Sequence, residues 1–345
     1  MHRAFVGWFL GVALILVLAV FAAGRLVDPY GHFSDTWSSY PDFMTAEDEA
    51  RLAEWQRQAP LLLNRPLFKV ANFEKFAAEA AARGEHVNVV VGDSLGRQVN
   101  PTALARQDGQ RWYTLAYGGA SLAEMLALVD HLLDHHDVGE IVWVLPFTSL
   151  AWETRNRMPG VLAALRNPVM HLFSYETVRA VFHVARHRWL GIPFSAYDPR
   201  EVGINPRDEA AMIDELQSFW SDRWLADVEA RLARAEAMGV QVTFVTAPKH
   251  PAFQALIDAE MPDQYATFRA FLEVHRLVDA GQPDHQDWTA DQFLDVHHLA
   301  TTEYPRFNDL ILQARGDLGH IAEPPEPRAD TYGTKAMLLP AGEEG

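Results

Sequence analysis

Short apolar runs alternate along this chain with segments of helical periodicity, and this order restricts the folds that it can adopt. Five runs have the length and the bounding residues of buried strands: residues 87–92, 112–117, 140–147, 240–248 and 275–281. Between them, segments such as 121–136 and 208–239 repeat apolar residues at the spacing of a helix. This order predicts a three-layer α/β domain with a mostly parallel five-stranded sheet.

Composition excludes several classes of function. The 345 residues are 49% hydrophobic and 22% charged, which is the balance of a globular protein. The formal net charge is -17 and no cluster of Lys and Arg offers a surface for phosphates, so a nucleic-acid partner is not expected. Cys is absent, which excludes disulfides, thiol catalysis and Cys-ligated zinc.

The N-terminal segment is long and apolar. Between Arg3 and Arg25 run 21 residues without a charge, which as a helix would cross the roughly 30 Å hydrocarbon core of a bilayer. We predict that residues 1–26 are a single-pass anchor in the cytoplasmic membrane, with the acidic chain beyond it on the periplasmic or extracellular side. A cleaved signal peptide, processed near residues 22–24, is the alternative, although the apolar run exceeds the roughly 7–15 residues usual for one.

The remaining chain is predicted to be one domain, residues 27–320, followed by a disordered tail, residues 321–345, that is rich in Pro, Gly and charge. The domain begins with two helical stretches within residues 45–84. Residues 150–207 interrupt the alternation with basic and aromatic side chains, and we predict a helical insertion. It could act as a lid or contact the membrane, but we favour a helical excursion whose aromatic residues pack on the domain.

Two segments far apart in the sequence carry the residue types of a nucleophile and its base. Gly92, Asp93 and Ser94 follow the first strand at the point where a helix should begin, and open α/β sheets bind ligands along that edge. A serine there still needs a base. Asp295 and His298 follow the last predicted strand, so one short loop delivers both a base and the carboxylate that orients it.

The Gly-Asp-Ser of residues 92–94, combined with the later Asp-x-x-His of residues 295–298, resembles the SGNH (GDSL) hydrolase superfamily over roughly residues 86–315. The resemblance implies a three-layer, flavodoxin-like fold in which Ser94 attacks an ester or acyl carbonyl. It further implies that His298 acts as general base and then acid, and that Asp295 orients the imidazole. His297 is then a neighbour rather than the catalyst, and no cofactor is implied.

The same resemblance implies an oxyanion hole. The backbone N–H of Ser94 and Gly119, from the Tyr-Gly-Gly-Ala-Ser of residues 117–121, would form it. The Asn that most family members carry after the third strand is missing from residues 144–152. In this departure, and in the Val-Asp-Pro-Tyr-Gly-His-Phe of residues 27–33, the chain resembles the membrane-anchored alginate O-acetylation proteins and the D-alanyl transfer proteins of teichoic acid.

Other polar residues admit two interpretations. Asp93 is expected to organise the turn before Ser94 rather than to tune the site. Arg97, one turn beyond Ser94, could bind an anionic group of the substrate or form a structural ion pair. Lys249 and His250 follow the fourth strand at the same sheet edge, where they would contact substrate or lie solvated in a loop.

Two pairs of histidines have a spacing that can bind zinc, but no metal site is predicted. His131 and His135 lie four residues apart without the Glu of a metalloprotease motif, so we interpret them as a solvated helix end. His183 and His187 repeat the spacing among arginines and are interpreted in the same way.

The resemblance predicts an envelope enzyme that makes or breaks an O-acyl ester, chiefly acetyl, on a cell-surface polysaccharide or related glycan. Transfer rather than hydrolysis would require an acyl-donor partner such as a multi-spanning membrane O-acyltransferase. A non-catalytic glycan-binding or assembly subunit is an alternative that the missing Asn leaves open. A membrane-surface lipase that uses residues 150–207 as a lid is another.

Overall fold

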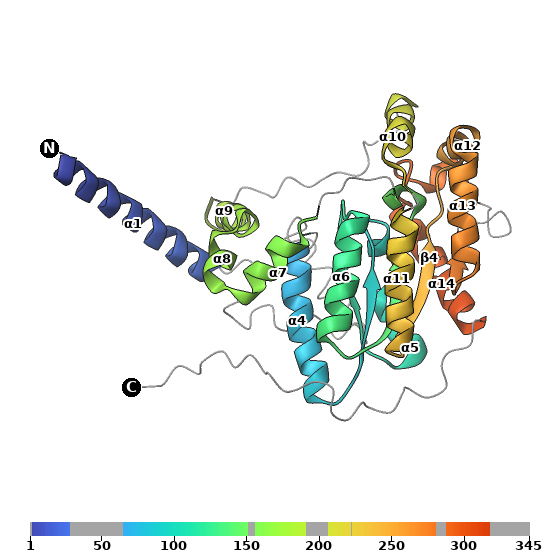
Figure 1. Cartoon of the computed structure of the whole chain (residues 1–345), viewed down its shortest axis with the longest axis horizontal. Helices are drawn as coiled ribbons and strands as arrows, with labels where there is room; N and C mark the ends of the chain where they lie inside the picture. Colours follow the sequence, from blue (N-terminus) through green and yellow to red (C-terminus); the bar gives the residue numbers. More distant parts are fainter. Residues whose placement is uncertain are drawn as a thin grey trace.

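A computed structural model of the chain describes residues 2–27, 65–150, 156–190, 206–221, 223–280 and 288–317. Its centre is a five-stranded sheet covered by helices, and the N-terminal helix α1 (His2–Val27) projects away from this body (Figure 1). The predicted helix in the first part of residues 45–84, the segment 27–33 and the tail 321–345 lie outside the described residues, apart from Val27 at the end of α1.

The strands are β1 (Val87–Val91), β2 (Trp112–Thr114), β3 (Val138–Val144), β4 (Gln241–Thr246) and β5 (Leu277–Asp279). Their order in the sheet is β2-β1-β3-β4-β5, and every pairing is parallel among the described residues. The predicted five-stranded α/β fold is therefore confirmed. Because the strands run parallel, their carboxyl ends, and the loops that follow them, meet at one edge of the sheet.

Successive strand residues point to opposite faces of the sheet, which divides the core into two clusters. Val89 and Trp143 pack in one cluster, whereas Val90 and Val142 pack in the other. The helices of the first cluster include α4 (Pro66–Ala82), α6 (Leu122–His135), α11 (Arg223–Ala237), α12 (Pro251–Glu260) and α13 (Pro262–Glu273). The second cluster lies against α5 (Pro101–Asp108) and α14 (Tyr304–Asp317). Apolar side chains on both faces explain why the strand sequences read as nearly continuous hydrophobic runs.

The segment 208–239, predicted to be continuously helical, forms two helices, α10 (Pro206–Phe219) and α11. Between them the Ser221 hydroxyl accepts a hydrogen bond from the backbone N–H of Arg223 at 3.4 Å, a local bond that competes with helix continuation. Trp220, at the break, packs on Phe147 with ring centroids 5.1 Å apart. A tertiary contact and a serine turn thus divide a segment whose periodicity alone does not mark the boundary.

The insertion after β3 contains α7 (Met158–Arg166), α8 (Pro168–Phe173) and α9 (Tyr175–Leu190). Both α8 and α9 contact α1. A Cβ atom at Gly24 of α1 would lie 2.6 Å from Leu172 Cδ2, so the glycine is what allows α8 to approach this closely. The aromatic side chains do not pack on the domain as expected. They are exposed on α8 and α9 at Phe173, Tyr175, Phe182 and Trp189, whereas Phe194 lies outside the described residues.

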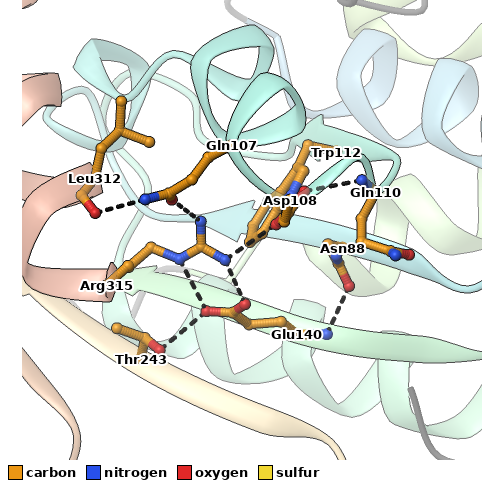
Figure 2. A network of polar contacts seen from close by, with 9 residues as sticks. All are labelled: Asn88, Gln107, Asp108, Gln110, Trp112, Glu140, Thr243, Leu312 and Arg315. Atoms are coloured by element: carbon orange, nitrogen blue, oxygen red, sulfur yellow. Dashed lines mark hydrogen bonds and ion pairs between the residues drawn. The ribbon is translucent and has the colours of Figure 1, made fainter. Parts of the chain in front are cut away.

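A buried arginine joins the last helix to the amino-terminal edge of the sheet. Arg315 of α14 is 1% exposed, and its guanidinium donates to Glu140 of β3 at 2.6 and 3.3 Å (Figure 2). It also donates to Gln107 at 2.9 Å and to Asp108 at 3.2 Å. Thr243 of β4 donates to the same Glu140 carboxylate. Figure 2 labels the whole network, which comprises Asn88, Gln107, Asp108, Gln110, Trp112, Glu140, Thr243, Leu312 and Arg315.

Candidate active site

Ser94 lies just beyond the carboxyl end of β1, an interior strand of the sheet. The strand ends at Val91, and the residues up to Leu95 form a turn that leads into a 3-10 helix, η2 (Gly96–Gln98). The α-helix expected directly after Ser94 is absent there. The next helix, α5, starts only at Pro101 because the Asn100 side chain accepts from the backbone N–H of Thr102 and fixes the helix start.

Two glycines allow this turn to lie close to the neighbouring strands. A Cβ atom at Gly96 would lie 2.7 Å from the Cβ of Ala116, and one at Gly92 would lie 3.1 Å from the Cβ of Val144. Asp93 closes the turn, since its carboxylate accepts from the backbone N–H of Leu95 at 2.8 Å. The geometry thus agrees with the structural interpretation of Asp93, and it gives Gly96 a packing role that sequence reasoning missed.

Asp295 and His298 lie on a short loop that closes on itself. The loop runs between Phe293 and Leu299, which form an antiparallel bridge, and the backbone N–H of Leu294 donates to the carbonyl of His298 at 2.7 Å. Inside it, Asp295 Oδ1 accepts from the backbone N–H of both His297 and His298 at 2.8 Å. Two backbone N–H groups thus hold the carboxylate within a closed loop before the imidazole is considered.

The two segments meet in a continuous chain of hydrogen bonds. His298 Nδ1 lies 2.8 Å from Asp295 Oδ2 and 3.0 Å from Oδ1, and His298 Nε2 lies 2.7 Å from Ser94 Oγ. An ionised carboxylate only accepts, so the network assigns the proton to Nδ1 and leaves Nε2 to accept from the serine hydroxyl. This arrangement can remove the proton from Ser94 as its oxygen attacks an electrophilic carbon.

The pKa values of Asp295 and His297 are both lowered from their ordinary values. Burial alone would raise the pKa of Asp295, but the hydrogen bond and charge of His298 outweigh burial and hold the pKa at about 2. Burial lowers the pKa of His297 to about 4, with a further contribution from the charge of His298. The His297 ring packs on Phe253, with ring centroids 4.8 Å apart, and His297 Nε2 lies 2.8 Å from Met212 Sδ.

The Gly119 turn lies beside the nucleophile turn. It follows β2, which pairs with β1, and the backbone N–H of Tyr117 donates to the carbonyl of Gly92 at 3.4 Å. The N–H of Ala120 donates to the Tyr117 carbonyl, and Gly119 has a φ of 66°, a left-handed conformation that favours glycine. The turn is thus attached directly to the residue two positions before Ser94.

An ion pair between Arg157 and Glu124, which sequence reasoning missed, also holds the Gly119 turn. Glu124 is 0% exposed, and Arg157 donates to its carboxylate through Nε at 2.6 Å and through Nη2 at 2.8 Å. The same Nη2 donates to the carbonyl of Gly119 at 2.9 Å, and the Tyr117 hydroxyl donates to Glu124 at 3.1 Å. Glu124 also completes a capping box with Ser121 at the start of α6. Ser-x-x-Glu in the sequence indicates the cap, but nothing in it indicates Arg157.

Among the described residues from the end of β3 to Leu150 there is no Asn. After β3 the chain forms a 3-10 helix, Phe147–Leu150, in which Thr148 and Ser149 are buried. The oxyanion hole of Ser94 and Gly119 backbone N–H groups stays a prediction.

The three predicted substrate contacts have different surroundings. Arg97 is exposed on η2, and burial together with the Arg97 charge lowers the pKa of Lys69 to about 7. The Lys249 ammonium lies over the Tyr265 ring, 5.3 Å from its centroid. His250 is buried, and its Nδ1 accepts from the backbone N–H of Ala252 to cap α12. Contact with substrate stays a prediction for all three residues, and Nδ1 of His250 also caps a helix.

Of the histidines near the end of α6, His135 is exposed, as expected for a solvated helix end, whereas His131 is not solvated. His131 is buried, and its Nε2 lies 2.7 Å from Glu74 Oε1, while His136 Nε2 lies 3.2 Å from the same oxygen. Burial would raise the pKa of Glu74, but these two hydrogen bonds lower it to about 2. The atoms of Glu74, His131 and His136 that could bind a metal ion lie within 4.8 Å of one another. We interpret these three residues as a polar contact between α4 and α6. His135 contacts Arg166, and the His183 and His187 side chains lie outside what the structure describes.

Burial raises the pKa of Asp93 to about 6, against an ordinary value of 3.8. An acid with a raised pKa holds its proton more tightly in the folded than in the unfolded state, so stability falls as the pH rises from about 4 to 6 and stays lower above that range. Asp93→Asn keeps an acceptor for Leu95 and removes this penalty. We expect its free energy of unfolding to exceed that of wild type by up to about 3 kcal/mol at pH 8, with no gain at pH 3.5.

Denaturant titrations of both proteins at the two pH values measure this difference. Asp309→Asn, at an exposed position of α14, is the matched control and should gain nothing at pH 8. An Asp93→Asn curve that follows wild type at both pH values would contradict the expectation.

Comparisons with known proteins give a limited result. No protein-family model matches the chain, and no curated protein matches it. Among solved structures, a Bacteroides fragilis protein described as a "putative acylhydrolase" is similar over 72% of this chain and 97% of its own, with 12% sequence identity and a TM-score of 0.38. The assignment of a function therefore depends on the residues of the site itself.

Proposed function

We propose that this chain is a membrane-tethered serine acyl esterase or O-acyltransferase. The observation that carries the proposal is the hydrogen-bonded chain from Ser94 Oγ through His298 to Asp295, at the carboxyl edge of a parallel sheet. Such a chain has the geometry of a nucleophile, a base and an orienting carboxylate.

In this mechanism the Ser94 oxygen attacks the acyl carbon while its proton passes to His298 Nε2. The ester C–O bond then breaks, and the imidazolium gives its proton to the departing alcohol, which leaves an acyl group on Ser94. A water or an acceptor hydroxyl attacks this acyl-enzyme next while His298 removes its proton. The bond between the acyl carbon and Ser94 Oγ then breaks, and the imidazolium returns the proton to Oγ, which regenerates Ser94. Asp295, ionised because its pKa is about 2, stabilises the imidazolium in both halves of the cycle.

The tetrahedral intermediates place a negative charge on the former carbonyl oxygen. We propose that the backbone N–H groups of Ser94 and Gly119 stabilise it. The attachment of the Gly119 turn to Gly92 and to Arg157 supports this role, because fixed donors need no reorganisation during the reaction.

For the substrate we propose acetyl or related acyl esters on an envelope polysaccharide or glycan. Two features support this: the resemblance to the membrane-anchored acyl-transfer branches, and α1, in which Phe5–Val27 is long and apolar enough to cross a membrane. The acidic body would then lie on the periplasmic or extracellular side of the cytoplasmic membrane. Transfer rather than hydrolysis would add a multi-spanning membrane O-acyltransferase as the donor of acyl groups.

Turnover of p-nitrophenyl acetate by the full chain in detergent tests the proposal. Wild type should release p-nitrophenolate and show an acyl adduct on Ser94 by mass spectrometry, and Ser94→Ala should lose both. Ser218→Ala, an exposed serine on α10, should behave like wild type. Equal turnover by all three proteins, with no adduct on Ser94, would reject the serine mechanism and favour the non-catalytic alternative.

Substitution of Arg157 tests whether the fixed position of the Gly119 turn contributes to catalysis. Arg157→Met leaves the buried Glu124 without its main partner and releases the Gly119 carbonyl, so we expect kcat to fall roughly tenfold or more with a smaller change in KM. Arg166→Met, at an exposed arginine of the neighbouring helix α7, is the control and should retain kcat. Steady-state kinetics are measured below the unfolding midpoint of each variant. A wild-type kcat in Arg157→Met would exclude the role.

A lipase acting at the bilayer surface is a second candidate, favoured by the exposed apolar side chains of α8 and α9 beside α1. Its test is the release of fatty acid from phospholipid vesicles that contain the full chain. Release that requires Ser94 would favour a lipid ester over a glycan ester as the substrate.

A further inference from the structure

Helices α8 and α9 expose large apolar side chains while several of their small or polar side chains are buried. His171 of α8 and Thr177 and Ala180 of α9 are buried, at 1%, 0% and 3% exposure. Large apolar side chains of the same two helices are exposed: Val169, Met170, Phe173, Tyr175, Val178, Phe182, Trp189 and Leu190. We call these eight residues the α8–α9 apolar face. In a water-soluble protein the aromatic residues would be expected inside and the small or polar ones outside.

The exposed side chains of α9 form a stripe along one side of the helix. Tyr175, Val178, Phe182 and Trp189 are separated by three, four and seven residues, which places them on one helical face. Arg179 and Arg186, also exposed, lie beside them. Aromatic rings interleaved with arginines are typical of a helix in the headgroup region of a bilayer, where rings reach the acyl boundary and guanidinium groups meet lipid phosphates.

This face is continuous with the helix that is able to span a membrane. α8 and α9 both contact α1, and Leu172 of α8 packs on Gly24 near the end of α1. Phe21 and Leu26, at the same end of α1, are exposed. In Figure 1, α9 is seen nearly along its axis whereas α1 lies across the view, so α9 crosses the end of α1 rather than continuing it. A helix that crosses the end of a spanning helix can lie in the plane of the membrane surface.

We infer that the α8–α9 apolar face docks on the lipid surface of the bilayer that α1 crosses. A single spanning helix restrains only the distance of the domain from the membrane. A second contact, made by side chains fixed to the domain through α7, sets its orientation as well. The inference rests on the proposed tether but not on the chemistry of Ser94.

Site-directed spin labels on the full chain test this contact, because the natural sequence contains no Cys and each introduced one is unique. Phe182→Cys and Trp189→Cys report on the α8–α9 apolar face, and Ile15→Cys reports on the middle of α1. Val274→Cys is the matched control, since Val274 is also apolar and exposed but directly follows α13, a helix that Figure 1 shows on the side of the domain away from α1. Each protein is reconstituted in vesicles of phosphatidylcholine and phosphatidylglycerol.

Collision rates with oxygen, which concentrates in lipid, and with a water-soluble nickel chelate then place each label. We expect labels at 15, 182 and 189 to favour oxygen, with 182 and 189 shallower than 15, and the label at 274 to favour the nickel chelate. Labels at 182 and 189 that respond like 274, while 15 lies in lipid, would overturn the docking but leave the tether intact. Labels shielded from both reagents, with spin–spin broadening, would show a second copy on this face and overturn it too. A label at 15 in water would reject the tether itself.

Discussion

His298→Ala should lower kcat for an acyl ester on the order of 10³-fold, whereas His297→Gln should change it little. The two histidines are adjacent, but only His298 lies within hydrogen-bond distance of Ser94, at 2.7 Å. Without its imidazole the Ser94 proton has no acceptor, and the leaving alcohol has no donor. The side chain of His297 instead contacts Phe253 and Met212, so its loss should affect packing more than chemistry.

The neighbouring position provides a demanding control for this experiment. Both variants alter a histidine of the same loop, so a general disturbance of residues 293–299 would affect them alike. The unfolding midpoint of each protein and the mass of the acyl adduct are measured beside kcat. Comparable losses in both variants, or full activity in His298→Ala, would contradict the assignment of His298 as the base.

Arg315→Met should reduce the free energy of unfolding by about 3–5 kcal/mol. Its guanidinium is buried and donates to Glu140, Gln107 and Asp108, so methionine fills much of the volume but leaves a buried carboxylate without its partner (Figure 2). Denaturant titration of the full chain in detergent measures the loss.

Two further variants separate charge from packing. Arg83→Met removes an exposed arginine paired with Glu85, and it should cost less than about 1 kcal/mol because water screens that pair. The double variant Arg315→Met with Glu140→Met removes both buried charges and should recover part of the loss. A double variant that is less stable than Arg315→Met would show that the network stabilises the fold by more than mutual neutralisation.

The fold could be predicted because it follows from local patterns. Each strand is a short apolar run, and the parallel sheet follows from the helices between the strands. Local patterns do not predict an element boundary that depends on a contact with a residue far away in the sequence. The break between α10 and α11 depends on the packing of Trp220 against Phe147, 73 positions earlier in the sequence. The apolar periodicity of α8 and α9 does not show that their aromatic side chains face outwards, because a helix has the same pattern whichever side is covered.

The candidate site divides in the same way. Ser94, Asp295 and His298 could be named from the sequence because their residue types and their places after strands are visible there, and their catalytic roles stay predictions. The supports around them could not be named. Arg157 meets Glu124 across 33 positions, and Gly96 matters only because Ala116 lies against it in space. Such contacts exist only once the tertiary structure has formed.

The separation of the two halves of the site along the chain has a consequence for biogenesis. Ser94 and His298 are 204 positions apart, and His298 is followed by α14, whose Arg315 must dock against the opposite edge of the sheet. A chain that is still emerging from the ribosome therefore holds Ser94 before it holds the histidine proposed as its base. The proposed acyl chemistry would begin only after His298 has been synthesised and has packed beside Ser94, so a copy truncated before His298 would be inert toward cellular esters.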